Sequence, residues 1–328
     1  MSDRSPASSS QMEPLLEIDD LHVGFRTAEG LVRAVDGVSL RVERGETLCI
    51  VGESGCGKSA LAMSIPHLLP HPAATFDAKR MSLDGIDLLH LQGRPLREVR
   101  GKRIGVIFQE PMTSLSPLHR IGDQISEAIL LHSGATRSQA RDKALDWLGK
   151  VGMPDPRRVL DAWPHELSGG MQQRVMVAMA LVHDPDLVIA DEPTTALDVA
   201  TQSQILALLR RLVNRESGLL LITHDMGVVR ERATRVAVMY AGQIVETAPA
   251  SLFFAEQRHP YSRALLASLP SAATRGKRLP VIPGSVPSPL DWPTGCRFRN
   301  RCAQARPECV EPPPLHAEAE RTWRCHQH

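Results

Sequence analysis

The stretch Gly52-Glu53-Ser54-Gly55-Cys56-Gly57-Lys58-Ser59 decides the fold of this chain. It follows the short apolar run Thr47–Val51, which is typical of a buried strand, and leads into the helix-forming run Ser59–Leu69. The spacing G-x-x-x-x-G-K-[ST] between a strand and a helix is that of a phosphate-binding loop. Glycines let successive backbone N–H groups converge on a phosphate, and the helix adds its positive N-terminal end. A chance glycine turn is the alternative, but it does not account for the flanking strand and helix.

The residue types in this loop have different expected roles. We expect Lys58 to lie against the β- and γ-phosphates and the Ser59 hydroxyl to ligate Mg²⁺. Cys56 is a small spacer whose place near a helix N-terminus predicts a lowered thiol pKa. The loop therefore predicts an ATP site with contacts from Gly52, Glu53, Ser54, Gly55, Cys56, Gly57, Lys58 and Ser59.

Two acidic residues follow a second buried strand, Leu187–Ala190. The carboxyl ends of parallel strands face the ligand crevice in an α/β sheet. Asp191 there suits an outer-sphere contact to Mg²⁺, and Glu192 suits polarising the attacking water. An Asp-Glu pair alone is also common at solvated strand ends, and it is the upstream phosphate loop that favours the catalytic interpretation.

The composition of the 328-residue chain is that of an ordinary globular protein, with 42% hydrophobic and 23% charged residues. A formal charge of +1 offers no basic field for a polyanion, so no nucleic-acid partner is expected. The sequence holds no run of about eighteen apolar residues, which predicts no membrane span. The segment Met1–Pro14 is rich in Ser and Pro and lacks a signal-peptide pattern, which predicts a disordered lead-in and a cytosolic protein.

Hydrophobic periodicity predicts the order of the elements. Runs of β-formers over Leu16–Val42, with turn signals at Glu29-Gly30 and Asp36-Gly37, predict an antiparallel β patch. The region Ile121–Met153 is predicted to be helical. The later α/β section is expected to contain the helices Met171–His183 and Thr201–Arg215, the strand Leu219–Thr223, and a hairpin made of Val236–Tyr240, Ala241-Gly242 and Ile244–Glu246. After about Leu269 the composition shifts to Pro, Arg and Cys.

The stretch Leu167-Ser168-Gly169-Gly170-Met171-Gln172-Gln173-Arg174 closely resembles the signature of the ABC ATPase family. Ser168 is a plausible helix N-cap, so this helix start is a second anion site. The resemblance implies that Ser168, Gly169, Gly170 and Gln172 contact the nucleotide held by a partner's phosphate loop. A simple helix cap after a loop is the alternative, but Gln172, Gln173 and Arg174 extend the match beyond it.

Further elements that resemble this family occur in the family's order. Gln109 matches the glutamine that contacts Mg²⁺ and water and couples to a helical subdomain, and Asp198 in Ala196-Leu197-Asp198 matches a loop that crosses to the opposing protomer. His224 matches the switch histidine that holds Glu192 and water in line, which makes Glu192, His224 and Gln109 the expected catalytic residues. Phe25 matches the aromatic residue that stacks on adenine, although an aromatic in a β patch is more often part of the core.

The resemblance narrows to the importer subgroup for dipeptides, oligopeptides and nickel. It rests on Gln109–Pro117, His259–Leu266, Ile282–Pro287 and Gly295–Cys302. The chain departs from the subgroup at Glu110, usually Asp, and at Ser116, usually Asn. The resemblance implies an α/β ABC ATPase with an antiparallel β subdomain and a helical subdomain at about 112–175, so we expect a lead-in at 1–14, the nucleotide-binding domain at 15–268 and a small Cys-rich extension at 269–328.

The partners follow from the same resemblance. They are a second ATPase subunit, related but distinct, two transmembrane permease subunits and a separate substrate-binding protein, which places the chain on the cytoplasmic face of the membrane. The sequence does not state the cargo, and dipeptide, oligopeptide, nickel and another small solute all stay open. Two other classes remain as alternatives: a non-transport ABC ATPase, for which neither a heptad-bearing insertion nor a second cassette is found, and a nucleotide sensor without turnover.

Four cysteines crowd the C-terminal segment: Cys296, Cys302, Cys309 and Cys325. Four soft thiolates suit Zn²⁺ or an iron–sulfur cluster, and a cytosolic location argues against disulfides. Zinc ribbons usually bring a short C-x₂₋₄-C knuckle, which these spacings lack. The subgroup resemblance implies a [4Fe-4S] cluster on these cysteines, with zinc or free thiols as the alternatives.

Overall fold

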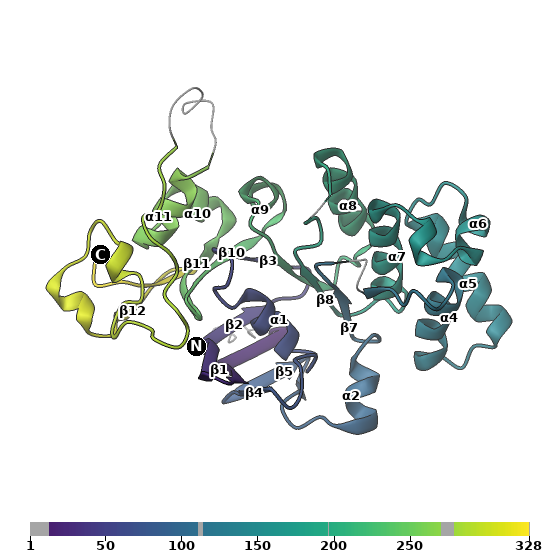
Figure 1. Ribbon diagram of the computed structural model, residues 1–328, viewed down its shortest axis with the longest axis horizontal. Coiled ribbons are helices and arrows are strands. Elements are labelled where there is room, and N and C mark those ends of the chain that lie inside the picture. The colour runs from purple at the N-terminus through teal and green to yellow at the C-terminus, as the bar shows by residue number, and fades with distance from the viewer. Residues whose placement is uncertain (1–12, 111–113, 196, 270–278, 328) are drawn as a thin grey trace, which may run out of the picture.

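The computed structural model describes residues 13–110, 114–195, 197–269 and 279–327. The predictions for 1–12, for the start of the helical subdomain at 112–113, for Ala196 and for 270–278 therefore lie outside the described residues. Figure 1 shows a small sheet below, a larger central sheet, a group of helices on one side and the C-terminal segment on the other.

The antiparallel β patch forms a sheet of its own. Its strands run in the order β2 (Gly30–Val42), β1 (Leu16–Thr27), β5 (Arg80–Leu83) and β6 (Ile86–Asp87), and β4 (Ala74–Asp77) also pairs with β1. One face packs against α1 and the central sheet through residues such as Ile18, Val38 and Met81.

The predicted turn at Asp36-Gly37 is wrong. Strand β2 continues through it, and Thr27 pairs with Gly30 at the hairpin that does form. Gly37 has φ 72°, and the register shifts near its partner residues Leu21 and His22. A single glycine inside a strand marks a bulge more often than a chain reversal, because a bulge needs only one residue at positive φ.

The central sheet has a parallel core extended by antiparallel strands. Its order is β12 (Leu315–Glu318), β13 (Arg321–Arg324), β11 (Gln243–Pro249), β10 (Arg235–Tyr240), β3 (Thr47–Val51), β9 (Gly218–Ile222), β8 (Leu187–Asp191) and β7 (Ile104–Ile107). Strands β10, β3, β9, β8 and β7 are mutually parallel, so their carboxyl ends share one edge. That edge carries the site described below.

The helices flank this sheet. They are α1 (Lys58–Ser64), α2 (Gly93–Val99), α4 (Ile121–His132), α5 (Arg137–Lys150), α6 (Pro156–Asp161), α7 (Gly169–Leu181), α8 (Val199–Leu212), α9 (Met226–Arg232), α10 (Ala250–Ala255) and α11 (Pro260–Ala267). Short 3₁₀ turns occur at Pro164–Glu166, at η3 (Arg299–Arg301) and at Pro307–Val310. Helix α1 ends earlier than predicted, because Pro66 removes a helical N–H and His67 adopts φ 55°.

Helices α4, α5 and α6 pack together beyond strand β7 (Figure 1), where the sequence predicts helix between Ile121 and Met153. Ala140, Ala144, Trp147 and Leu148 form the buried face of α5, as their spacing predicts. Thr136 caps that helix with a capping box that includes Gln139. In the part of the chain that is described, no helix is both long and apolar enough to cross a bilayer.

Candidate functional site

A cavity of about 600 Å³ opens at the carboxyl end of β3. Residues from separate parts of the sequence line it, and it brings the phosphate loop to Gln109, Glu192 and His224. The loop residues in its wall are Gly52, Glu53, Ser54, Gly55, Gly57, Lys58 and Ser59. Gln109, Glu192 and His224, which follow the strands β7, β8 and β9, therefore meet the loop in one place, and Asp191 is the last residue of β8.

Two loop glycines are required by close backbone approach. A Cβ at Gly52 would lie 2.2 Å from the Met239 carbonyl oxygen, and one at Gly57 would lie 2.1 Å from that of Ala34. Gly57 also adopts φ 107° directly before α1. The loop is therefore wedged between β2 and β10, which fixes where its N–H groups point.

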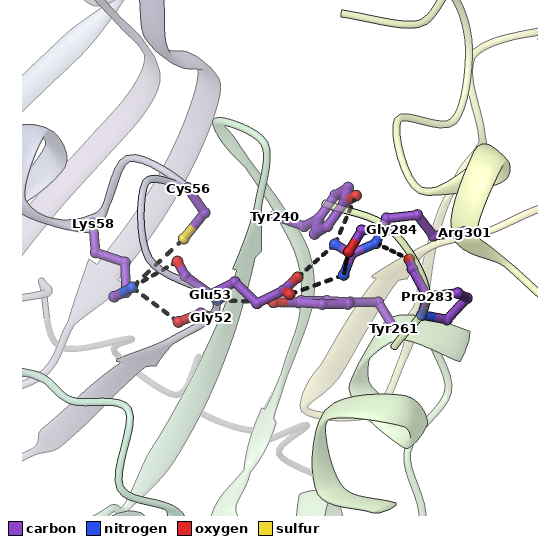
Figure 2. A network of polar contacts seen from close by, with 9 residues as sticks. All are labelled: Gly52, Glu53, Cys56, Lys58, Tyr240, Tyr261, Pro283, Gly284 and Arg301. Carbon is purple, nitrogen blue, oxygen red and sulfur yellow. Dashed lines mark hydrogen bonds and ion pairs between the residues drawn. The ribbon is translucent and has the colours of Figure 1, made fainter. Parts of the chain in front are cut away.

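Lys58 is buried, with 5% of its surface exposed, and its ammonium group is folded back onto the loop. Its Nζ donates to the carbonyl oxygens of Gly52 at 2.9 Å and Glu53 at 3.0 Å, as Figure 2 shows. The same Nζ lies 3.7 Å from the Cys56 Sγ. Both carbonyl acceptors are neutral, so neither competes with an incoming anion as a counter-charge.

The expected lowering of the Cys56 pKa is wrong. Burial raises the pKa of this thiol, and the nearby Lys58 charge offsets that only in part. The sulfur faces the inside of the loop, where it is 1% exposed. Cys56 is therefore a packing residue without thiolate reactivity.

Asp191 and Ser59 form a pair suited to a divalent cation. Burial raises the pKa of Asp191, while a hydrogen bond from Ser59 opposes the shift. Among the described residues, the buried Asp191 Oδ1 has no hydrogen-bond partner. A buried carboxylate oxygen without a donor, next to a hydroxyl and the phosphate loop, fits Mg²⁺ with its hard oxygen ligands.

Glu192 and His224 contact each other across two strand ends. The His224 Nδ1 lies 3.3 Å from the Glu192 Oε2, and the Thr195 hydroxyl donates to the same oxygen at 2.8 Å. Glu192 adopts φ 45°, an uncommon backbone conformation for a residue that is not glycine, and its N–H donates to the Ile222 carbonyl oxygen. The carboxylate is thus oriented from both its backbone and its side chain, while His224 is largely exposed.

Of two further predicted ATP contacts, Gln109 lines the cavity and Phe25 lies elsewhere. Gln109 is exposed just beyond the end of β7 and lines the cavity wall. Phe25 lies near the end of β1, partly buried against the cluster that includes Val23 and Leu61. It is not part of the lining as far as the described residues define it, so its adenine-stacking role stays a prediction.

The second predicted anion site lies at the start of α7. Ser168 is exposed and caps the helix, accepting from the Met171 N–H at 3.4 Å. A Cβ on Gly170 would come within 2.9 Å of the Thr201 methyl group, which explains the glycine there. Asp198 caps α8 and accepts from the Thr201 N–H and hydroxyl at 3.0 and 2.7 Å, so two helix N-termini lie close together on the surface.

Gln172 and Gly169 behave differently within this group. The Gln172 amide is buried, and it donates to the carbonyl oxygens of Pro164 at 2.7 Å and Leu167 at 3.3 Å. That geometry makes Gln172 a support of the loop before Ser168. Gly169 is exposed beside it, and a Cβ there would lie 3.9 Å from a Leu197 methyl carbon.

The four C-terminal cysteines lie in one neighbourhood. Burial raises the pKa of Cys296 to about 11 and also raises the pKa values of Cys302 and Cys325, and the neighbouring cysteines add to each of these three shifts. Each sulfur accepts a backbone N–H: those of Cys296 and Cys302 from Phe298 and Gln304, and those of Cys309 and Cys325 from Arg306 and Gln327. All four thiols are free.

This neighbourhood has the donor chemistry of a metal centre but not its geometry. Within the described ranges, no group of three or more His, Cys, Asp or Glu side chains is placed to hold a metal ion. The structure therefore does not support a bound iron–sulfur cluster or zinc ion in this arrangement.

Two residues that contact the phosphate loop are not predicted from the sequence. Arg301 pairs with Glu53 through both carboxylate oxygens, and the Tyr261 hydroxyl accepts from the Glu53 N–H at 2.9 Å. The sequence signal was present, since both lie in the stretches His259–Leu266 and Gly295–Cys302 that carry the subgroup resemblance. Nothing in the spacing predicted that they reach the phosphate loop.

Comparison with known proteins agrees with this geometry. The sequence pattern of the family "ABC transporter" matches residues 35–195, and that of "Oligopeptide/dipeptide transporter, C-terminal region" matches residues 245–309. A probable peptide ABC transporter ATP-binding protein from Sinorhizobium fredii is 48% identical over 327 residues, which cover 98% of both chains. The dipeptide transport ATP-binding protein DppD of Escherichia coli is 46% identical over 315 residues, 95% of this chain and 96% of the relative.

A solved structure shares the fold. The dimeric post-hydrolysis state of an ATP-binding cassette bound to ADP and Pi superimposes with a TM-score of 0.63 at 28% identity, over 72% of this chain and 98% of that chain. This confirms the predicted ABC ATPase fold, with its mixed α/β sheets. The chain belongs to the ABC transporter family as one of its ATP-hydrolysing, ATP-binding proteins.

Proposed function

We propose that this chain hydrolyses ATP to power the import of peptides across the cytoplasmic membrane, on whose cytoplasmic face it sits. One observation carries the ATPase part: the phosphate loop, the unpartnered Asp191 oxygen and the Glu192–His224 pair share one strand-end edge. The peptide cargo is supported by the relatives, which are named for peptide and dipeptide transport.

Phosphoryl transfer asks a protein mainly for positioning and charge neutralisation. Lys58 leaves its loop carbonyls to bind the β- and γ-phosphates. Asp191 and Ser59 hold Mg²⁺, which neutralises phosphate charge when bound. Glu192 orients the attacking water and accepts its proton, and His224 keeps that carboxylate in line.

Two chains complete the site in this proposal. Ser168 and Gly170 reach the γ-phosphate bound to the partner's loop, and Asp198 lies at the same contact. Closure buries the phosphates of two ATP molecules between the chains, and hydrolysis weakens that contact. The exposed caps of α7 and α8 support this assignment, because neither Ser168 nor Asp198 is among the described residues that line the cavity at their own chain's phosphate loop.

The working complex contains further subunits. These are a second ATPase, related but distinct, two transmembrane permease subunits and a separate substrate-binding protein. Gln109 lines the cavity and precedes the helices α4 to α6 in the sequence, which supports a role in which it couples the nucleotide state to a docked permease. No nucleic-acid partner is proposed, in line with the formal charge of +1.

The C-terminal cysteines form a separate element of the proposal. Cys296, Cys302, Cys309 and Cys325 would be the ligands of a [4Fe-4S] cluster, and their thiols would have to move closer together to hold it, because in the described residues they do not form a metal site. The N–H donors to all four sulfurs support this cofactor. Anaerobically purified protein should be brown and contain iron, whereas colourless protein with stoichiometric zinc would contradict the cluster.

Reconstitution tests the function directly. The purified complex in liposomes should hydrolyse ATP faster when the binding protein is loaded with a dipeptide or oligopeptide, and it should accumulate that peptide. Stimulation by nickel alone would assign the same ATPase to another cargo. ATP hydrolysis that responds to neither would contradict an import role.

A further inference from the structure

Glu53 places a carboxylate inside a loop that must hold a polyanion. It is the second residue of the phosphate loop, and it lines the ATP cavity. An uncompensated carboxylate there would repel the triphosphate. This repulsion is stronger in a partly buried site than in water, because the surroundings screen the two charges less. The loop can accept ATP only if that charge is neutralised or turned away.

Arg301 does both. Its Nη1 lies 2.7 Å from the Glu53 Oε2, and its Nη2 lies 2.9 Å from the Oε1, which is a bidentate ion pair. The Arg301 side chain is 6% exposed and the Glu53 side chain 29% exposed. Figure 2 shows the Glu53 side chain turned toward Arg301, on the side of the loop away from Lys58.

Arg301 is itself locked in place. Its Nε donates to the Pro283 carbonyl oxygen at 2.7 Å, and its remaining donors reach the Tyr240 hydroxyl at 3.3 Å and the Gly284 carbonyl oxygen at 3.4 Å. The guanidinium therefore arrives preorganised, because three fixed acceptors orient it independently of Glu53.

Glu53 transmits this restraint to Lys58. Its N–H donates to the Tyr261 hydroxyl, and its carbonyl oxygen accepts from the Lys58 Nζ at 3.0 Å. One residue thus joins the C-terminal arginine to the lysine that binds phosphate (Figure 2). Both the charge and the shape of the loop depend on the pair.

A second set of contacts reaches the loop indirectly, through the turn after β10. Arg297 donates to the Asp36 carboxylate and the Ala241 carbonyl oxygen, and its guanidinium stacks 3.5 Å from the centroid of Trp292. The neighbouring Gly242 N–H donates to the Cys56 carbonyl oxygen at 2.9 Å. The segment 283–302 therefore contacts the phosphate loop directly through Arg301 and supports it indirectly through the turn at Ala241-Gly242.

We propose that Arg301 is a positioning residue of the ATP site: it supplies the counter-charge that lets a phosphate loop containing Glu53 accept a triphosphate. Through it the C-terminal segment 283–302 becomes part of the ATP-binding machinery of its own chain. Any change that displaces the chain between Cys296 and Cys302 weakens ATP binding, because Arg297 and Arg301 both lie there. This inference rests on ATP binding at the phosphate loop.

The experiment is an equilibrium titration of the full-length chain with MgATP and MgADP. Arg301→Met should weaken MgATP binding about tenfold, since it leaves the Glu53 charge uncompensated. MgADP should lose less, and added salt should restore part of the loss, because both reduce the repulsion. Arg301→Lys, which keeps the charge, should stay within about threefold of the parental chain.

The neutral double variant separates charge from folding. Glu53→Gln with Arg301→Met should recover at least half of the loss on a logarithmic scale, because no carboxylate remains to repel ATP. Arg299→Met is the matched control, since this residue lies in the same short helix η3 and contacts Thr294 instead of the loop.

Three results would overturn the inference. They are unchanged MgATP affinity in Arg301→Met, a double variant that binds no better than the single one, and an equal loss in Arg299→Met. A parental chain that fails to bind MgATP would refute the ATPase function itself, a result that is distinct from all three.

Discussion

The two helix starts that carry the ATP-site predictions differ in how complete they are. At the start of α1, the buried Lys58 and the wedged glycines form the wall of a 600 Å³ cavity. At the start of α7, the exposed Ser168 caps only its own helix. Both are anion sites by the same physics, yet one is enclosed and the other faces outward. Under the proposed function, this difference means that a single chain would supply one half of each of two ATP sites.

Glu192→Gln gives the largest expected effect, because it separates binding from turnover. The amide keeps the size of the side chain but cannot accept a proton from water, so hydrolysis should fall about 1000-fold. ATP affinity should be retained, and closed dimers should accumulate in MgATP. Single-turnover hydrolysis and sedimentation of the assembled ATPase measure both effects. Hydrolysis at the parental rate would remove Glu192 from its assigned role.

Lys58→Ala tests the enclosed anion site at the start of α1. The ammonium supplies charge-assisted hydrogen bonds to phosphate, and its loss should weaken MgATP binding about 100-fold. Titration with a fluorescent ATP analogue checks this on the isolated chain. Lys79→Ala is the control, since that ammonium pairs with Asp20 on the β patch. Equal affinity in the Lys58 variant would contradict the enclosed site.

Ser168→Ala tests the exposed anion site at the start of α7. It should lower ATP hydrolysis only in the assembled ATPase pair. Hydrolysis should fall about tenfold for the loss of one hydrogen bond to a charged group. MgATP affinity of the single chain should stay unchanged. Loss of the N-cap costs about 1 kcal/mol of stability, so Thr136→Ala, which removes the cap of α5, is the matched control. A similar loss of hydrolysis in both variants would reduce Ser168 to a helix cap.

Asp191→Asn should change the free energy of unfolding only slightly. It should stabilise the fold even though it lowers the activity. Burial raises the folded-state pKa of Asp191 above the unfolded value, so the ionised form at pH 7 opposes folding. That cost disappears as the pH falls below the unfolded pKa. Asparagine should therefore stabilise the metal-free chain by about 1 kcal/mol at pH 7 and by less at pH 4, while Mg²⁺-dependent hydrolysis is lost.

Thermal unfolding at the two pH values, without nucleotide or metal, measures this sign. A variant that is less stable than the parental chain at pH 7 would mean that Asp191 serves the fold and not the cation. Proton competition should likewise weaken Mg²⁺ binding in the parental chain as the pH falls.

Local patterns predicted the strands of the parallel core and which residues would gather at their carboxyl ends. Strand β3 begins and ends as expected, and the loop, the acidic strand end and His224 meet in one cavity. Parallel strands bring their carboxyl ends to one edge, so residues at those ends are neighbours whatever their separation in sequence. The bulge at Gly37 and the early end of α1 were missed, because a single Gly or Pro has several local outcomes.

The C-terminal segment was far less predictable. Its composition suggested little regular structure, yet β13 pairs with β11 and extends the central sheet. Arg301 and Glu53 lie 248 positions apart, and no periodicity relates them. Such contacts depend on how the whole chain packs, and a sequence pattern does not encode them. Likewise, the pKa of Cys56 follows burial and not its place near a helix start.

A structure of the assembled ATPase pair, carrying Glu192→Gln and trapped with MgATP, tests the central claim most directly. The account predicts that each bound triphosphate lies between Lys58 of one chain and the α7 start of the other, with the Ser168 hydroxyl within hydrogen-bond reach of the γ-phosphate. Nucleotide bound by one chain alone, with Ser168 turned to bulk water, would contradict it.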